Sequence, residues 1–285
     1  MIHKVCKDII SGLRIDRFVE TGTFVGETMA RVSGWMTAMD PAFGTITGQK
    51  TDDQLAAFCP QRRIAYPVFQ DASPDSKIKI FSVDIDAANH QALKQLFAGN
   101  PNINIILDSS DRFLERAIGK GTLRESDRCL FYLDAHWGED WPLRREIVQV
   151  LRLKRSVIVI DDFVVPWHPW HGFDAYKTRV CGWYYISDLF KGKKIDVFYP
   201  KKANDDGRGT VIIFVGYQDG ELKFMDKLPC FRPFLFRGAP LITLAVRLAL
   251  SFLVLTGLYP LLLKLYLSRK WGSLQQAPMK SLVGK

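Results

Sequence analysis

Acidic residues end five short apolar runs of this chain, and they are its strongest candidates for chemistry. They are Glu20, Asp84, Asp108, Asp134, Asp161 and Asp162. Because parallel strands all end at one edge of a sheet, acids at their carboxyl ends converge on one crevice. Capping of a following helix explains a single acid at such a place. Five acidic strand ends in register favour a ligand-binding crevice.

The first acid lies in a turn with two glycines, which is the stretch R-F-V-E-T-G-T-F-V-G-E-T from position 17 to 28. The apolar residues before Glu20 predict a strand. Gly22 allows a tight turn, and Gly26 allows a helix to begin close to a ligand. Glu20 can accept hydrogen bonds from an ammonium or hydroxyl group. Taken alone, the pattern also fits an ordinary strand-to-helix turn.

The remaining acids sort by chemistry. Asp84 ends the second strand, where nucleotide sites place the acid that binds ribose. Three carboxylates from adjacent strands, Asp134, Asp161 and Asp162, would repel one another unless protons or a cation neutralised them. Oxygen ligands favour Mg²⁺, Mn²⁺ or Ca²⁺ over zinc. The sequence therefore predicts a divalent metal site, the alternative being that one of the three caps a helix.

Strands and helices alternate in the segment that carries the acids. Strands are expected at 78–83, 103–107, 129–133 and 157–160, with helices at 87–98, 112–118 and 142–154. Short, continuously apolar runs separated by helices predict a parallel sheet covered on both faces. Two further runs at 195–199 and 210–217 flank a turn-rich loop and predict a terminal antiparallel strand. The fold class is α/β: a Rossmann-like, doubly wound, mostly parallel sheet.

We assign residues 1–226 to this domain, with two unusual segments. Residues 35–77 carry four prolines and form a long insertion, which is either a lid over the site or a surface excursion without a role in binding. Residues 163–190 are dense in aromatic and histidine side chains, including His168 and His171. That segment is either an acceptor pocket wall or a packed aromatic subcore.

Charge and cysteine usage exclude several classes. The net charge is +9, and residues 227–285 carry nine Lys or Arg and no Asp or Glu, so the domain before them is formally neutral. No nucleic-acid surface is therefore expected there. The five cysteines are scattered singly, which favours a reducing compartment over a disulfide framework or zinc knuckle. The N-terminus lacks the apolar core of a signal peptide, so we expect the domain in the cytosol.

The segment 227–285 predicts an apolar helical tail that associates with a membrane. Leu248 to Leu263 are sixteen uncharged residues, about 24 Å of helix, whereas the hydrocarbon core is about 30 Å thick. Arg247 and Pro260 disfavour a longer span. Basic flanks on anionic headgroups fit a monotopic anchor at the cytoplasmic face better than a single pass through 241–267. A helical pair packed on the domain or on a dimer partner remains the alternative.

Five motifs in order carry a family resemblance: V-E-T-G-T-F-V-G, S-V-D-I-D, L-D-S-S-D, F-Y-L-D-A-H-W and V-I-V-I-D-D-F. Together they resemble class I S-adenosylmethionine-dependent methyltransferases. More narrowly, they are similar to the metal-dependent O-methyltransferases of the catechol type and of bacterial sugar and macrolide pathways. The resemblance covers residues 16–217.

The resemblance implies S-adenosylmethionine and Mg²⁺ (or Mn²⁺ or Ca²⁺) as cofactors. It implies that the cofactor is bound by Glu20, Gly22, Thr23, Gly26, Asp84, Asp108 and Ser109, and the metal by Asp134, Asp161 and Asp162. The family's lysine base has no counterpart, because Gly138 and Glu139 follow the His-Trp pair. His136, beside Asp134, is our first candidate for the base, and His168 and His171 remain alternatives.

The function implied is metal-assisted methylation of a hydroxyl on a sugar, polyol or other small-molecule or glycan acceptor. The alternative is a non-catalytic module that keeps the cofactor fold and binds a glycan or protein at the membrane. A dehydrogenase is disfavoured, because the chain has no G-x-G-x-x-G run.

Overall fold

The computed structural model describes residues 2–23, 28–29, 32, 78–135, 140–166, 168, 170–176, 179–204 and 207–233. The predicted insertion at 35–77 and residues 234–285 of the predicted tail lie outside the described residues, as do Gly26 and His136. Met1–Pro233 forms one compact unit. In the described part of the chain no helix is long and apolar enough to cross a membrane.

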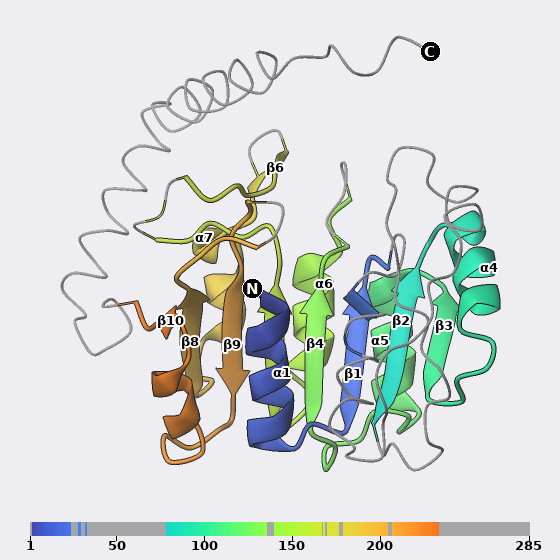
Figure 1. Ribbon diagram of the computed structural model, residues 1–285, viewed down its shortest axis with the longest axis horizontal. Coiled ribbons are helices and arrows are strands. Elements are labelled where there is room, and N and C mark those ends of the chain that lie inside the picture. Colours follow the sequence, from blue (N-terminus) through green and yellow to red (C-terminus); the bar gives the residue numbers. More distant parts are fainter. Residues whose placement is uncertain are drawn as a thin grey trace, which may run out of the picture. The chain divides into compact units, whose positions relative to one another are not determined.

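The described residues form an eight-stranded sheet of order β10-β8-β9-β5-β4-β1-β2-β3 (Figure 1). Its strands are β1 (Arg17–Thr21), β2 (Lys79–Asp84), β3 (Ile103–Leu107), β4 (Cys129–Leu133), β5 (Ser156–Ile160), β8 (Ile195–Pro200), β9 (Val211–Val215) and β10 (Cys230–Phe231). Strands β1 to β5 pair in parallel, whereas β9 is antiparallel to both β5 and β8. The predicted mixed α/β sheet is confirmed.

The order 3-2-1-4-5 of the first five strands is that of a doubly wound sheet. The chain returns to β4 on the far side of β1, which makes the gap between β1 and β4 the topological switch point. Ligands bind at such a point, outside the carboxyl ends of the strands. We call this side of the sheet the carboxyl edge.

Helices cover both faces of the sheet. One core cluster packs α5 (Ser110–Gly119), α6 (Leu143–Val150) and the segment of α7 (Trp183–Ile186) and η1 (Ser187–Phe190) on one face. The other packs α1 (Ile2–Leu13), α4 (Ala87–Leu96) and η2 (Lys223–Lys227) on the opposite face. Alternation along β1 sends Phe18 into one cluster and Val19 into the other. Each strand end is therefore held from both sides.

Helix α1 is an element that our sequence reading missed. Its apolar residues Val5, Cys6, Ile9, Ile10 and Leu13 recur at helical spacing and are all buried. The helix ends where β1 is about to begin, and Ile15 N–H bonds the carbonyl of Ile10. The packing of α1 therefore fixes where β1, the strand that carries Glu20, begins.

Several element boundaries also differ from the prediction. Helix α5 starts at Ser110 with Ser109 as its N-cap, and α6 stops at Val150, because residues 151–155 turn directly into the buried strand β5. Strand β10 lies beyond position 226 and pairs with β8, so the compact unit continues to Pro233.

Replacing Ile9 with Ala tests whether α1 stabilises the sheet. The side chain is 0% exposed, and truncating such a residue typically costs about 2–5 kcal/mol of unfolding free energy. Urea unfolding should show that loss. Lys7→Ala on the same helix should stay within about 0.5 kcal/mol of wild type; equal losses would contradict this packing role.

Candidate active site at the carboxyl edge

The turn after β1 crosses the end of β4 at very close range. Gly22 has a φ of +78°, and a Cβ atom there would lie 2.5 Å from the carbonyl oxygen of Asp134. Backbone hydrogen bonds fix the crossing, since Gly22 N–H bonds Val83 O and Asp134 N–H bonds Thr21 O. Glycine is therefore required at this position both for conformation and for space. The turn after β1 therefore lies directly against the end of β4, at the switch point.

Glu20 is a buried carboxyl at this turn, 2% exposed. The hydroxyl of Ser82, one strand away, donates to Glu20 Oε2 at 2.7 Å and lies 2.8 Å from Thr23 Oγ1. Burial raises the pKa of Glu20 to about 8, and the Ser82 hydrogen bond opposes that rise. Glu20 is thus protonated at neutral pH until a cation arrives to stabilise the carboxylate.

Asp84 is held in place at the end of β2 and does not cap the following helix. It is 8% exposed, and its Oδ1 accepts the backbone N–H of Asp86 at 2.8 Å. Asp86 itself caps α4 by accepting from Ala88 N–H and Asn89 N–H. Helix capping therefore does not account for Asp84, and a ligand role remains.

Asp108 and Ser109 are tied to neighbouring side chains. Asp108 forms an ion pair with Arg116 and lies 3.6 Å from Arg112, and the Ser109 hydroxyl donates to Asp111. Both residues stand at the start of α5, beyond β3, where the resemblance places the adenine. Their contacts fix the shape of that corner.

The carboxyls of Asp134, Asp161 and Asp162 lie close enough to influence one another. The pKa of Asp134 is raised well above its usual range. Burial is the largest cause, and the negative charges of Asp161, Asp162 and Glu20 add to it. Burial and Asp161 also raise the pKa of Asp162, whereas the guanidinium of Arg208, which contacts Asp162, favours its carboxylate form. The structure thus brings together acids from β1, β4 and β5.

The predicted metal triad, however, is closed by protein groups. Asp161 accepts hydrogen bonds from Tyr132, Asn204 and Thr210, and Asp162 pairs with Arg208. Nowhere in the described ranges do three His, Cys, Asp or Glu side chains lie so that they could hold one ion. Asp161 therefore has no free acceptor position for a divalent cation, and the positive charge of Arg208 already lies against Asp162.

Asp162 has an unusual backbone conformation, with a φ of +53°. This left-handed region costs a non-glycine residue about 1–2 kcal/mol, although Asp tolerates it better than most. Its carbonyl accepts the N–H of Asp174 at 2.8 Å, and Arg208 holds its carboxylate. These contacts attach the aromatic segment to the end of β5.

The aromatic segment 163–190 divides into a core half and an exposed half. Phe190 is buried and stacks on Trp183 with ring centroids 5.7 Å apart. Trp170 is 68% exposed and rests edge-on against His168, which stacks on the buried His171 at 5.0 Å. The packed-subcore interpretation is confirmed for the Trp183–Phe190 part, whereas the acceptor-wall interpretation of the exposed part stays a prediction.

The two imidazoles have unused hydrogen-bonding atoms. Within the described ranges, Nδ1 of His168 and Nδ1 of His171 have no hydrogen-bond partner. His171 lies beside Gly209, next to the residues that hold Asp161. Burial, followed by the charge of His168, lowers the pKa of His171. A neutral imidazole at pH 7 can accept a proton.

Sequence reasoning missed the residues that neutralise the acids. Tyr132 lies within an apolar strand, and Asn204, Arg208 and Thr210 come from the loop that precedes β9. The antiparallel prediction for β9 was the available signal, because it brings the start of that strand to the carboxyl edge. Glu146 on α6 was also missed; it is fully buried, and burial raises its pKa to about 7.

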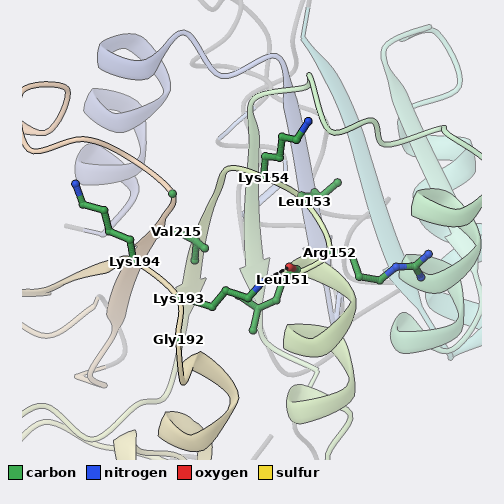
Figure 2. Close-up of a pocket in the computed structure, with 9 residues that line it drawn as sticks. Leu151, Arg152, Leu153, Lys154, Gly192, Lys193, Lys194 and Val215 are labelled. Atoms are coloured by element: carbon green, nitrogen blue, oxygen red, sulfur yellow. Dashed lines mark hydrogen bonds between the residues drawn. The ribbon is translucent and has the colours of Figure 1, made fainter.

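A separate hollow of about 290 Å³ lies at the amino edge of the parallel strands, between the end of α6 and the end of β9 (Figure 2). Lys193 Nζ donates there to the carbonyl of Leu151 at 3.3 Å. Lys154 and Lys194 pair with acids nearby. A cation at a helix C-terminus complements the helix dipole, so Lys193 stabilises the end of α6. The hollow lies at the opposite edge of the parallel strands from the acids.

No protein-family model matches the chain, and no curated protein matches it. Among solved structures it is similar to the O-methyltransferase TomG from Streptomyces achromogenes, in complex with S-adenosylmethionine, at 11% identity and a TM-score of 0.44 over 76% of this chain and 80% of that one. It is also similar to a Staphylococcus aureus protein assigned as a caffeoyl-CoA O-methyltransferase, at 12% identity and a TM-score of 0.43 over 75% of this chain and 83% of that one. An rRNA methylase from Streptococcus thermophilus is similar at 11% identity and a TM-score of 0.39, over 75% of this chain and 95% of that one. At these identities the likeness concerns fold alone.

By its own topology, the chain is a doubly wound, Rossmann-like α/β protein with a cluster of carboxyl groups at the carboxyl edge of its sheet.

Gly22→Ala should destabilise the protein more than Gly121→Ala. Both glycines have positive φ, +78° and +71°, but an added Cβ meets the Asp134 carbonyl at Gly22 and open space at Gly121. Conformational strain of roughly 1–2 kcal/mol is common to both, so the difference in urea unfolding free energy isolates the close approach. Equal losses would show that the crossing adjusts easily.

Proposed function

We propose that this protein is an S-adenosylmethionine-dependent O-methyltransferase that methylates a hydroxyl of a sugar, polyol or other small-molecule or glycan acceptor. The observation that carries the proposal is Glu20, a buried carboxyl that burial keeps protonated, beside a glycine turn at the switch point. Residues 18–23 contain no Lys or Arg. Such a turn suits a cationic, phosphate-free ligand better than a phosphate.

Each part of the cofactor has a candidate partner on the carboxyl edge. Glu20, with Gly22 and Thr23, would bind the ammonium of the methionine part. Asp84 would accept both ribose hydroxyls, as a buried and positioned carboxylate can. Asp108 and Ser109 would frame the adenine. When bound, the cofactor supplies a reactive methyl group on a positively charged sulfur.

The chain's own residues would then align the acceptor oxygen and take its proton. The acceptor oxygen would gain the methyl group, and the electron pair of the broken sulfur–carbon bond would remain on sulfur. The hydroxyl proton would pass to a neutral imidazole, His171 or His168 being the described candidates. Asp134, whose pKa is raised by burial and by the charges of Asp161, Asp162 and Glu20, would hold the acceptor hydroxyl. His136 remains a further candidate for the base.

No step of this mechanism passes through a metal ion, because Asp161 and Asp162 are engaged by protein donors. The exposed indole of Trp170, supported by His168, supports the choice of acceptor. A flat apolar face of this kind packs against sugar rings. Hydroxyl-rich acceptors also suit an edge lined with carboxylates.

Titration calorimetry with S-adenosylmethionine tests the proposal. Below a pKa of about 8 Glu20 holds a proton in the free protein, and a bound ammonium favours the carboxylate. Binding should therefore release a proton, and affinity should rise from about pH 6 to about pH 7.5. Two buffers of different ionisation enthalpy would measure the release. Absence of binding at millimolar ligand would favour the non-catalytic module.

Glu20→Gln should weaken cofactor binding and remove its pH dependence. Because the folded pKa of Glu20 is raised, its stabilising contribution is complete at acid pH and is lost as pH rises through about 8. The variant should therefore unfold at a higher temperature than wild type at alkaline pH. Glu125→Gln is the control, since Glu125 is exposed and pairs with Lys154. A variant that binds like wild type would exclude Glu20 from the cofactor site.

For the segment beyond Pro233, we keep the proposal of membrane association at the cytoplasmic face. Its support is the uncharged run Leu248–Leu263 together with basic flanks free of Asp and Glu. A transferase held in this way would meet lipid-linked or membrane-proximal glycan acceptors.

A chain that ends at Pro233 should stay in solution with anionic vesicles, whereas the full chain should sediment with them. This end point retains β10, which an end at Asp226 would remove. Uncharged zwitterionic vesicles serve as the control, and weaker sedimentation is expected with them. If both forms stay in solution, or both sediment, the tail is not the anchor.

A further inference from the structure

Asp161 has no free position for a ligand. A carboxylate offers about four acceptor sites. Oδ1 accepts from Thr210 Oγ1 at 2.8 Å and from Asn204 Nδ2 at 3.1 Å. Oδ2 accepts from the Tyr132 hydroxyl at 2.6 Å and from the same Asn204 amide at 3.1 Å. An entering cation would have to displace donors from two elements, Tyr132 of β4 and the residues Asn204 and Thr210 of the loop before β9.

Arg208 supplies the positive charge beside it. Its Nη1 contacts carboxylate oxygens of Asp162 and Asp174 at 2.5 Å each. The backbone of Arg208 is also held in place. Its N–H donates to Asn204 Oδ1, and Arg208 forms an isolated β-bridge with Gly172. The guanidinium therefore joins the end of β5, the aromatic segment and the loop before β9.

We propose that Arg208 stands in place of the divalent cation that the motif series implies. The site at the end of β5, formed by Asp161 and Asp162, is then closed to metal and works without it. A guanidinium is always protonated and has five N–H donors in fixed directions. Nη1 serves both carboxylates, and within the described ranges Nε and Nη2 have no partner, while the side chain is 41% exposed. On the proposed function, these donors would hold acceptor oxygens that a metal would otherwise chelate.

The inference concerns cation binding and can be tested without the methyl donor. Wild type, Arg208→Gln and Arg208→Lys would be unfolded thermally in chelator and in millimolar Mg²⁺, Mn²⁺ or Ca²⁺. We expect the wild-type midpoint to be the same in all four conditions. Arg208→Gln removes the guanidinium charge from beside Asp162 and Asp174, so the midpoint of this variant should be lower in chelator and rise with added cation. Arg208→Lys keeps a positive charge, so added cation should raise its unfolding midpoint only slightly.

Arg144→Gln is the matched control, because Arg144 of α6 forms an ion pair with one acid of the aromatic segment, Asp188, and also donates to the carbonyl of Tyr185. No cation response is expected from this variant. Titration of wild type with Mn²⁺ keeps the inference testable if Arg208→Gln does not fold, and no saturable heat is expected. Saturable Mn²⁺ binding to wild type would overturn the proposal. So would an Arg208→Gln variant that folds and gains nothing from cations. Failure of S-adenosylmethionine binding would leave this result unaffected.

Discussion

The constraint on which this structure depends is the crowding of carboxyl groups at one edge of a parallel sheet. Strands that end together deliver Glu20, Asp134, Asp161 and Asp162 into a shared, poorly hydrated space. Like charges in such a space cannot all stay ionised without compensation. The chain compensates each one differently, with a proton, with hydrogen-bond donors or with a guanidinium. Those differences give the crevice its two halves.

On the side of β1 and β2 the compensation is incomplete. Glu20 has the side-chain donors Ser82 and Thr28 and still keeps a raised pKa. On the proposed function, a cationic ligand would stabilise its carboxylate. On the side of β5 and β9 the compensation is built in, because Asp161 is saturated and Asp162 is paired with Arg208. Asp134 lies under the influence of both halves. A positively charged methyl donor and a neutral hydroxyl acceptor fit this division.

Much of the fold could be predicted from local patterns. Strands β3 and β4 have the predicted bounds, and β9 is antiparallel as expected. These elements are short, continuously apolar runs whose burial on both faces leaves little alternative. Helix α1, whose apolar residues Val5, Ile9 and Leu13 recur at helical spacing, was missed. Strand β10 was missed because two residues carry no periodicity, and only its pairing with β8 defines it.

The sequence by itself determined that acids would end the strands and that Gly22 would lie in a tight turn, since hydrophobic runs and glycine act locally. Only the tertiary structure decided what neutralises each acid. Tyr132, Asn204, Thr210 and Arg208 reach Asp161 and Asp162 from 29 to 49 residues away. No spacing rule connects such partners, because they meet through strand order. The sequence alone therefore allowed a metal triad, whereas side-chain contacts between distant elements replaced it with a closed, charge-paired network.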